Sequence, residues 1–155
     1  MNIVKTWQTR STSSGQTEQL GEQIGNNLRG GEVIELISDL GGGKTTFTRG
    51  LVRGAGSDDA VASPTFTLSK EYVCPGFHIV HYDFYRLGEA GIVGDELAET
   101  TQDKQRVIVV EWGDIVQNIL PDHTVRVTLQ LQSDGSRLII CQYPETRAYL
   151  FVDIA

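Results

Sequence analysis

The chain has 155 residues, 39% of them hydrophobic, which is enough for one domain with a substantial core. Its 13 Lys and Arg against 20 Asp and Glu give a net charge of −7, which disfavours broad, sequence-independent binding to a nucleic-acid backbone. The N-terminal residues lack the apolar run of a signal peptide, and no stretch approaches the roughly 20 apolar residues that span a bilayer. We therefore expect one cytoplasmic domain over residues 1–155, with no membrane partner.

The first predicted elements are a strand and a helix. Residues 2–8 alternate imperfectly between apolar and polar side chains, which indicates a strand. Ser13 begins a sequence similar to a capping box, and apolar residues follow at helical spacing, so we expect a helix over about 15–29. Gly21 and Gly25 fall on one side of this helix, where they either allow close packing or are simply tolerated.

Residues 38–45 form a glycine-rich segment between the apolar run 33–37 and a predicted helix. A strand, a glycine-rich loop and a helix in this order are the setting of a P-loop, in which backbone N–H groups and the helix N-terminus bind phosphate. Lys44 would reach the β and γ phosphates, and the Thr45 hydroxyl would bind Mg²⁺. The alternative is an ordinary glycine-rich turn. The usual pattern begins with glycine, so a positive φ at Ser38 would cost about 1 to 2 kcal/mol.

The helix after this loop carries Phe47 and Leu51 one turn apart and ends near Gly54. Residues 63–68 then alternate threonines with apolar residues after a proline. Two interpretations remain open for this segment. It is either the entry to a strand or a switch-like loop whose hydroxyl groups touch the γ-phosphate or its metal.

Two predicted strands, 77–83 and 106–111, each end in a carboxylate, Asp83 and Glu111. In open α/β sheets, ligands gather outside the carboxyl ends of the strands, so both acids are candidates to meet at the P-loop. An apolar strand that ends in Asp or Glu is typical of a Walker B element, whose carboxylate holds Mg²⁺ or positions the attacking water. Either acid alone is more often a surface residue at a strand end.

The remaining segments carry weaker signals. Residues 86–105 predict helical pieces joined by a loop, and clean alternation over 125–131 followed by a turn at Asp134 predicts an antiparallel hairpin. Residues 146–155 fit a short helix or a strand. Together these elements predict an α/β domain with a C-terminal antiparallel hairpin.

Histidine and cysteine provide no metal site in this sequence. His78 and His81 fall on opposite faces of one strand and cannot bind one ion, so structural or surface roles are favoured. Cys74 and Cys141 lack metal-ligand spacing, which favours reduced structural thiols. The guanine signature Asn-Lys-x-Asp is absent, which favours ATP over GTP.

Several stretches together resemble the TsaE (formerly YjeE) family, the small bacterial ATPases of tRNA threonylcarbamoyladenosine biosynthesis. They occur in the order of that family and cover most of residues 38–121. The family usually begins its loop with Gly-Asp-Leu-Gly, whereas this chain has Ser38, and residues 88–104 fit the family poorly. The matching stretches are Asp39-Leu40-Gly41, Gly43-Lys44-Thr45-Thr46-Phe47, Ser63-Pro64-Thr65-Phe66-Thr67-Leu68, His81-Tyr82-Asp83, Tyr85-Arg86, Glu111-Trp112 and Leu120-Pro121.

The resemblance implies a three-layer fold of the P-loop NTPase type, with a mixed, mainly parallel central sheet. It also implies that ATP and Mg²⁺ are ligands and that intrinsic ATP hydrolysis is weak. It also implies two partner proteins, TsaB and TsaD, which transfer threonylcarbamoyl to adenosine 37 of tRNAs that read codons beginning with A. Hydrolysis would then reset the complex, and tRNA would be reached indirectly, through the partners.

Residue roles also follow from the resemblance. Lys44 would bind phosphate, Asp83 would be the acid required for hydrolysis, and Glu111 would serve the metal. Thr45, Glu111 and Asp83 are the candidate metal residues, and Lys44, Asp83 and Glu111 are the candidate catalytic residues. The candidate switch loop contains Ser63, Thr65 and Thr67. The candidate nucleotide-binding residues are Asp39, Leu40, Gly41, Gly42, Gly43, Lys44, Thr45, Thr46 and Arg137.

Two other functions remain open at this point. A P-loop kinase for a small metabolite would need an acceptor pocket and usually an arginine-bearing lid, and the sequence shows no arginine cluster of that kind. A nucleotide-sensing interaction module would bind ATP without hydrolysing it.

Overall fold

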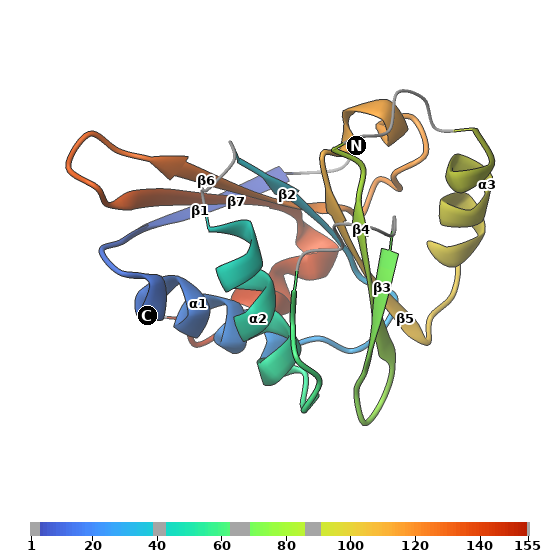
Figure 1. Ribbon diagram of the computed structural model, residues 1–155, viewed down its shortest axis with the longest axis horizontal. Coiled ribbons are helices and arrows are strands. Elements are labelled where there is room, and N and C mark those ends of the chain that lie inside the picture. The colour runs from blue at the N-terminus through green and yellow to red at the C-terminus, as the bar shows by residue number, and fades with distance from the viewer. Residues whose placement is uncertain (1–3, 39–42, 63–68, 86–90, 155) are drawn as a thin grey trace.

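The computed structural model describes residues 4–38, 43–62, 69–85 and 91–154. These residues form one seven-stranded sheet with helices on both faces, which confirms the predicted α/β fold (Figure 1). The strands are β1 (Val4–Ser11), β2 (Val33–Ile37), β3 (Ser69–Val73), β4 (His78–Asp83), β5 (Arg106–Glu111), β6 (Val125–Leu131) and β7 (Arg137–Pro144), and the helices are α1 (Ser14–Asn26), α2 (Lys44–Gly54), α3 (Gly91–Thr100) and the 3-10 helices η1 (Gly113–Val116) and η2 (Glu145–Phe151).

The sheet is parallel in the middle and antiparallel at both edges, as the mixed-sheet prediction requires. Its strand order is β1-β7-β6-β2-β5-β4-β3. Neighbours among β6, β2, β5 and β4 pair in parallel, whereas β1 with β7, β7 with β6, and β3 with β4 pair antiparallel. Because the central strands are parallel, their carboxyl ends lie at the same edge of the sheet, which positions the candidate site.

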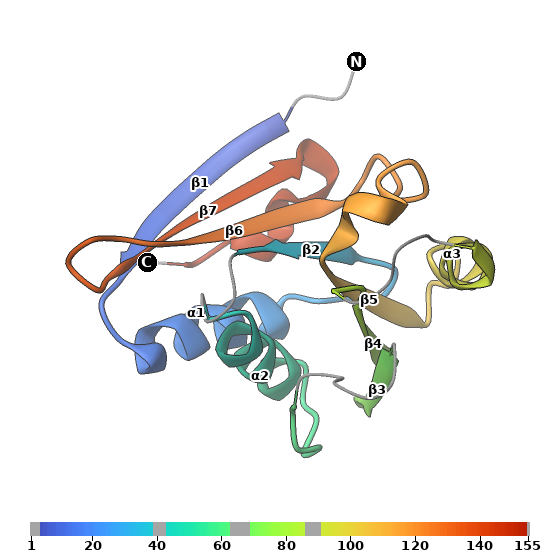
Figure 2. The same ribbon diagram turned by 45° about the horizontal axis from the view of Figure 1, so that its top comes forward.

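The helices make the second and third layers. α1 and α2 cover one face, over the larger core cluster that includes Leu36, Phe47 and Val127 (Figure 2). α3 and η1 cover part of the other face, over a smaller cluster that includes Val110 and Leu97. Alternate residues of the central strands point into these two cores, so both faces of β2 and β5 are buried.

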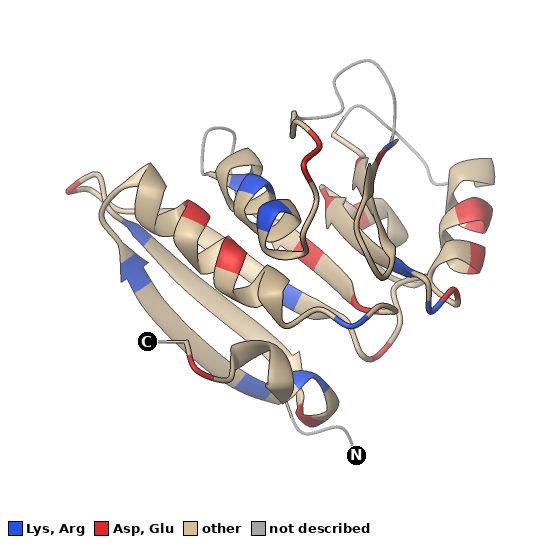
Figure 3. Ribbon diagram, turned by 90° about the horizontal axis from the view of Figure 1, so that it is seen from below, with Lys and Arg blue, Asp and Glu red and all other residues tan. Residues whose placement is uncertain are grey.

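α1 and α2 pack closely because glycines line their contact. A Cβ at Gly21 would lie 2.3 Å from the carbonyl oxygen of Phe47, and one at Gly50 would lie 1.9 Å from that of Glu18, so neither side chain fits. This confirms close packing as the role of Gly21. Charges of opposite sign border the contact, with acidic residues on α1 and arginines on α2 (Figure 3).

Most element boundaries agree with the sequence prediction. Ser13 caps α1, since its side chain accepts a hydrogen bond of 3.1 Å from the Gln16 N–H. The predicted hairpin is formed by β6 and β7, and the last segment is the 3-10 helix η2 rather than a strand. Both cysteines are free and buried, as expected. Among the helices of the described ranges, none combines the length and apolar character needed to cross a bilayer.

Two strands differ from the prediction. β1 extends to Ser11 because it pairs with β7 over its whole length. β3 was not predicted as a separate strand. It is an edge strand in which only Tyr72 is buried, so its sequence lacks a clear apolar alternation.

Candidate functional site

Asp83 and Glu111 end neighbouring parallel strands and stand directly opposite each other in the register of β4 and β5. The Glu111 carbonyl oxygen also accepts a hydrogen bond of 3.1 Å from the Phe84 N–H, which fixes the strand ends together. Both acids share a sheet face with the core residue Val109, and this is the face that α2 covers. The structure therefore brings the two predicted carboxylates together at one edge.

Lys44 begins α2, and its side chain points toward Glu111. Its side chain is only 7% exposed, and its ammonium group lies 3.8 Å from Glu111 Oε1 and 3.3 Å from the carbonyl oxygen of Ser38. The preceding residue, Gly43, has a φ of 102° and gives the helix no side-chain cap. The first turn of α2 thus presents backbone N–H groups and a buried cation in one place, which suits an anion.

His81 supports Glu111, a contact that the sequence analysis did not anticipate. The two residues share a buried hydrogen bond between His81 Nε2 and Glu111 Oε2. In the register of β4 with β5, His81 stands opposite Val109, so Glu111 is its diagonal neighbour on the same face. This buried contact agrees with the structural role that the sequence favours for His81. His78 is exposed on the other face and bonds Glu71 instead.

Trp112 follows Glu111 and has an uncommon backbone. Its φ of 57° and ψ of 50° place it in the left-handed region, which costs a non-glycine residue about 1 to 3 kcal/mol. In this conformation the indole ring lies 4.2 Å from the Lys44 ammonium and 4.9 Å from the ring of Tyr85. The tryptophan thus closes one side of the lysine and limits its contact with water.

Two other predicted residues lie near the same loop. The Arg137 side chain packs against Gly43, where its Nε atom would stand 3.3 Å from an added Cβ. Thr45 and Thr46 are half-buried in the first turn of α2. Ser38 is not among the described non-glycine residues with positive φ, so the strain considered for its position is absent.

The remaining predicted residues lie outside the described part of the chain. They are Asp39, Leu40, Gly41 and Gly42 of the loop and Ser63, Thr65 and Thr67 of the candidate switch segment. Whether residues 63–68 are a switch or a strand entry stays open.

The described residues fit a nucleotide with magnesium. Mg²⁺ prefers oxygen ligands and is commonly held by one or two carboxylates together with phosphate oxygens. Glu111 lies beside the Lys44 ammonium, and Asp83 and Thr45, at the ends of the neighbouring elements, carry further oxygens of the kind that such a site would need. Over the ranges that the structure describes, no group of three His, Cys, Asp or Glu side chains is placed to hold a metal, and a site of this kind does not need one.

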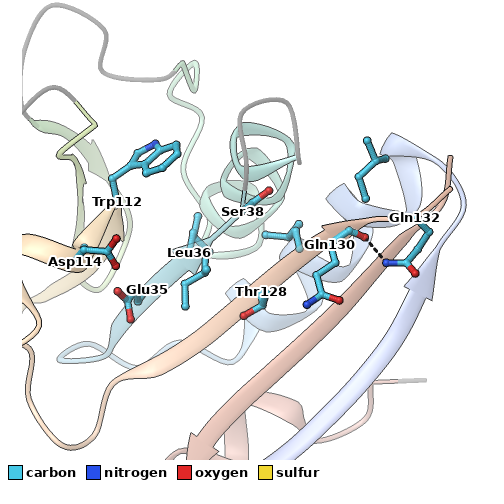
Figure 4. A pocket seen from close by; sticks show the side chains of 12 residues that line it. Glu35, Leu36, Ser38, Trp112, Asp114, Thr128, Gln130 and Gln132 are labelled. Carbon is cyan, nitrogen blue, oxygen red and sulfur yellow. Dashed lines mark hydrogen bonds between the residues drawn. The ribbon is translucent and has the colours of Figure 1, made fainter.

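A pocket of about 520 Å³ opens beside the site, between Trp112 and β6 (Figure 4). Glu35 and Asp114 lie on one side of it and Thr128 and Gln130 on the other, with Ser38 between them. Thr128 and Gln130 alternate with core residues of β6 that face α1 and α2, so this pocket lies on the opposite face of the sheet.

Fold and site together define an α/β protein with a buried lysine at the start of the helix after β2, a carboxylate beside it, and a second carboxylate at the end of the next parallel strand. The family model described as "Threonylcarbamoyl adenosine biosynthesis protein TsaE" matches residues 11–139. This chain belongs to the TsaE family.

Individual relatives agree with the family match. A protein of Treponema pallidum named tRNA threonylcarbamoyladenosine biosynthesis protein TsaE is 36% identical over 129 residues, which cover 83% of this chain and 95% of that protein. A protein of the same name from Bacillus subtilis is 32% identical over 134 residues, covering 84% and 81%. The crystal structure of Bacillus subtilis YdiB superimposes with a TM-score of 0.75 at 27% identity, covering 95% of this chain and 91% of that one.

Proposed function

We propose that this protein binds ATP and Mg²⁺ at residues 38–46 and hydrolyses ATP as part of threonylcarbamoyladenosine formation in tRNA. The observation that carries this proposal is the contact of the buried Lys44 ammonium with Glu111, whose register partner at the end of β4 is Asp83, in a chain of the TsaE family. A buried ammonium group beside two strand-end carboxylates is the arrangement expected for phosphoryl chemistry.

Each residue then has a distinct task. Lys44 and the N–H groups of the first turn of α2 bind the phosphates, and Thr45 and Glu111 hold the metal ion. Asp83 orients the attacking water and accepts its proton. When bound, Mg²⁺ adds positive charge beside the phosphates. His81 and Trp112 keep Glu111 and Lys44 in place, so catalysis relies on positioning and preorganised charge.

The proposed partners are TsaB and TsaD, with tRNA reached through them and with adenosine 37 of tRNAs reading codons that begin with A as the modified position. The net charge of −7 supports an indirect contact, because an acidic protein is poorly suited to bind the tRNA backbone by itself. The proposed location is the cytoplasm.

The test is ATP hydrolysis by the purified protein, alone and with a TsaB–TsaD pair. We expect slow turnover that rises with the partners and disappears in Lys44→Ala, whose fold is checked by its circular dichroism spectrum. Turnover that ignores the partners would contradict the partner assignment. ATP binding without turnover under all conditions would contradict the ATPase proposal and favour the non-hydrolysing interaction module.

A further inference from the structure

Glu35 is a buried carboxylate that the proposed chemistry does not use. It lies in the middle of β2 with its side chain 3% exposed, on the sheet face opposite the α1–α2 core, where it lines the pocket of Figure 4. Its Oε1 atom accepts a hydrogen bond of 3.0 Å from Arg126, and its Oε2 atom accepts one from the Gln117 side chain. A carboxylate with this degree of burial requires such partners, and Gln117, which directly follows η1, connects it to the segment after β5.

The Gln117 amide links Glu35 to the backbone beside Trp112. Its Nε2 atom donates to Glu35 and also to the carbonyl oxygen of Gly113, at 3.1 Å. Gly113 itself packs against Glu35, since an added Cβ would lie 2.6 Å from Glu35 Oε2. The carboxylate therefore lies against Gly113, the residue that directly follows Trp112, and is also linked to the Gly113 carbonyl through Gln117.

The position of this peptide determines where the indole ring lies. Trp112 has a left-handed backbone that a bulky residue adopts only when its surroundings impose it, and its ring is thereby brought over Lys44. We propose that Glu35, acting through Gln117 and Gly113, is a positioning residue that holds Trp112 over the phosphate-binding lysine. Its effect on ATP rests on the proposed function, whereas its effect on Trp112 does not.

The test uses a matched pair of variants, Gln117→Met and Arg126→Met. Both remove a hydrogen-bond partner of Glu35, but only Gln117→Met removes the donor to the Gly113 carbonyl. Arg126→Met also removes the bond from Arg126 to Gln117, so it disturbs the cluster but leaves the Gln117 donor to the Gly113 carbonyl in place. Both side chains are exposed at the surface, which favours folding of both variants.

The first measurement needs no nucleotide. In a Trp7→Phe background, Trp112 is the only tryptophan of the chain, so its fluorescence reports its own surroundings. We expect iodide quenching of Trp112 to rise and its emission to shift to longer wavelength in Gln117→Met, with little change in Arg126→Met. Equal quenching and emission in the two variants would overturn the proposal, even if one of them were the less stable protein.

The second measurement is the dependence of hydrolysis on ATP concentration. A displaced indole leaves Lys44 more hydrated and removes a cation–π contact, so we expect KM for ATP to rise about two- to thirtyfold in Gln117→Met while kcat changes less. Arg126→Met should keep the original KM. A changed fluorescence with an unchanged KM would overturn the effect on ATP, and a loss of turnover in every variant and the parent would count against the proposed function instead.

Discussion

The two ends of the parallel strands each hold a buried glutamate, and the two residues differ in how they are bonded. At the amino end, Glu32 is fully buried and accepts hydrogen bonds from the Arg29 and Gly30 N–H groups, at 2.9 and 2.8 Å, and from the Tyr149 hydroxyl. At the carboxyl end, Glu111 is equally buried but has the His81 ring on one oxygen and the Lys44 ammonium at 3.8 Å from the other.

This difference shows that burial alone does not mark a functional acid. Both carboxylate oxygens of Glu32 accept hydrogen bonds, from N–H groups of the turn before β2 and from the Tyr149 hydroxyl of η2. These bonds hold η2 and the start of β2 together. Glu111 instead faces the Lys44 ammonium, a cation that begins α2 beside the N-terminal N–H groups of that helix. On the proposed function, the glutamate at the amino end stabilises the fold and the glutamate at the carboxyl end takes part in the chemistry.

The largest expected effect at the carboxyl end comes from Asp83→Asn. The amide cannot accept a proton from water, so we expect hydrolysis to slow by about 10²- to 10⁴-fold while ATP binding is retained. Steady-state kinetics and calorimetric titration measure the two quantities. Asp114→Asn, in an exposed acid of η1 beside the pocket, is the control and should leave both unchanged. An unchanged rate in Asp83→Asn would remove that residue from the mechanism.

The paired substitutions Glu32→Gln and Glu111→Gln test the comparison directly. Glu32→Gln replaces one of the two accepting oxygens by an NH2 group, which cannot accept a hydrogen bond from a backbone N–H. It should therefore lower the free energy of unfolding by about 1 to 3 kcal/mol, with normal hydrolysis per folded molecule. Glu111→Gln should lose Mg²⁺-dependent hydrolysis at a temperature where the variant is folded. Urea unfolding and hydrolysis assays on both variants provide the data. Loss of hydrolysis in a fully folded Glu32→Gln variant would contradict the assignment of different roles to the two ends.

The helix pair offers a test that should affect stability alone. Gly21→Ala places a methyl group against the backbone of α2, so we expect a loss of about 1 to 3 kcal/mol in the free energy of unfolding. Gly15→Ala, in the same helix, meets only the Ser13 hydroxyl at 3.7 Å and should be neutral or slightly stabilising. Thermal unfolding of the two variants measures the difference, and equal melting temperatures would contradict the close contact.

The smallest expected effect is a pH dependence at the amino end. Burial, and then the neighbouring Glu32, raise the pKa of Tyr149 to about 12, so the fold favours the neutral phenol. The stability that Tyr149 contributes is present below about pH 10 and is lost as the pH rises toward 12. Burial raises the pKa of the Cys141 thiol to about 12 as well, which adds to the same trend.

Tyr149→Phe should therefore flatten the alkaline loss of stability without abolishing it, and should cost about 1 kcal/mol near neutral pH. Urea unfolding at pH 8 and pH 11 compares the variant with the original protein. If the free energy of unfolding fell by the same amount between pH 8 and pH 11 in both proteins, Tyr149 would not contribute to the alkaline loss of stability.

Much of the fold could be predicted from local patterns, because strands, caps and turns are set by neighbouring residues. The runs that end at Asp83 and Glu111, the cap at Ser13 and the β6–β7 hairpin are of this kind. β3 was missed because an edge strand with a single buried residue leaves little trace in its sequence.

The contacts around the site were harder to predict, because they depend on which strands are neighbours and in what register. His81 reaches Glu111 only as its diagonal neighbour across β4 and β5. In the sequence, Glu35 is a single polar residue within an apolar run, and its contacts with Gln117 and Arg126 exist only in the folded protein. The spacing of residues along the sequence predicts neither the contact of His81 with Glu111 nor the contacts of Glu35.

The most direct test of the central claim is a calorimetric titration of ATP into the protein, with and without Mg²⁺. The account predicts one ATP site per chain, with an affinity that depends on Mg²⁺. ATP binding should be lost in Lys44→Ala and unchanged in Glu32→Gln. Equal binding by Lys44→Ala and the original protein would contradict it, because the nucleotide would then lie somewhere other than the carboxyl end of β2.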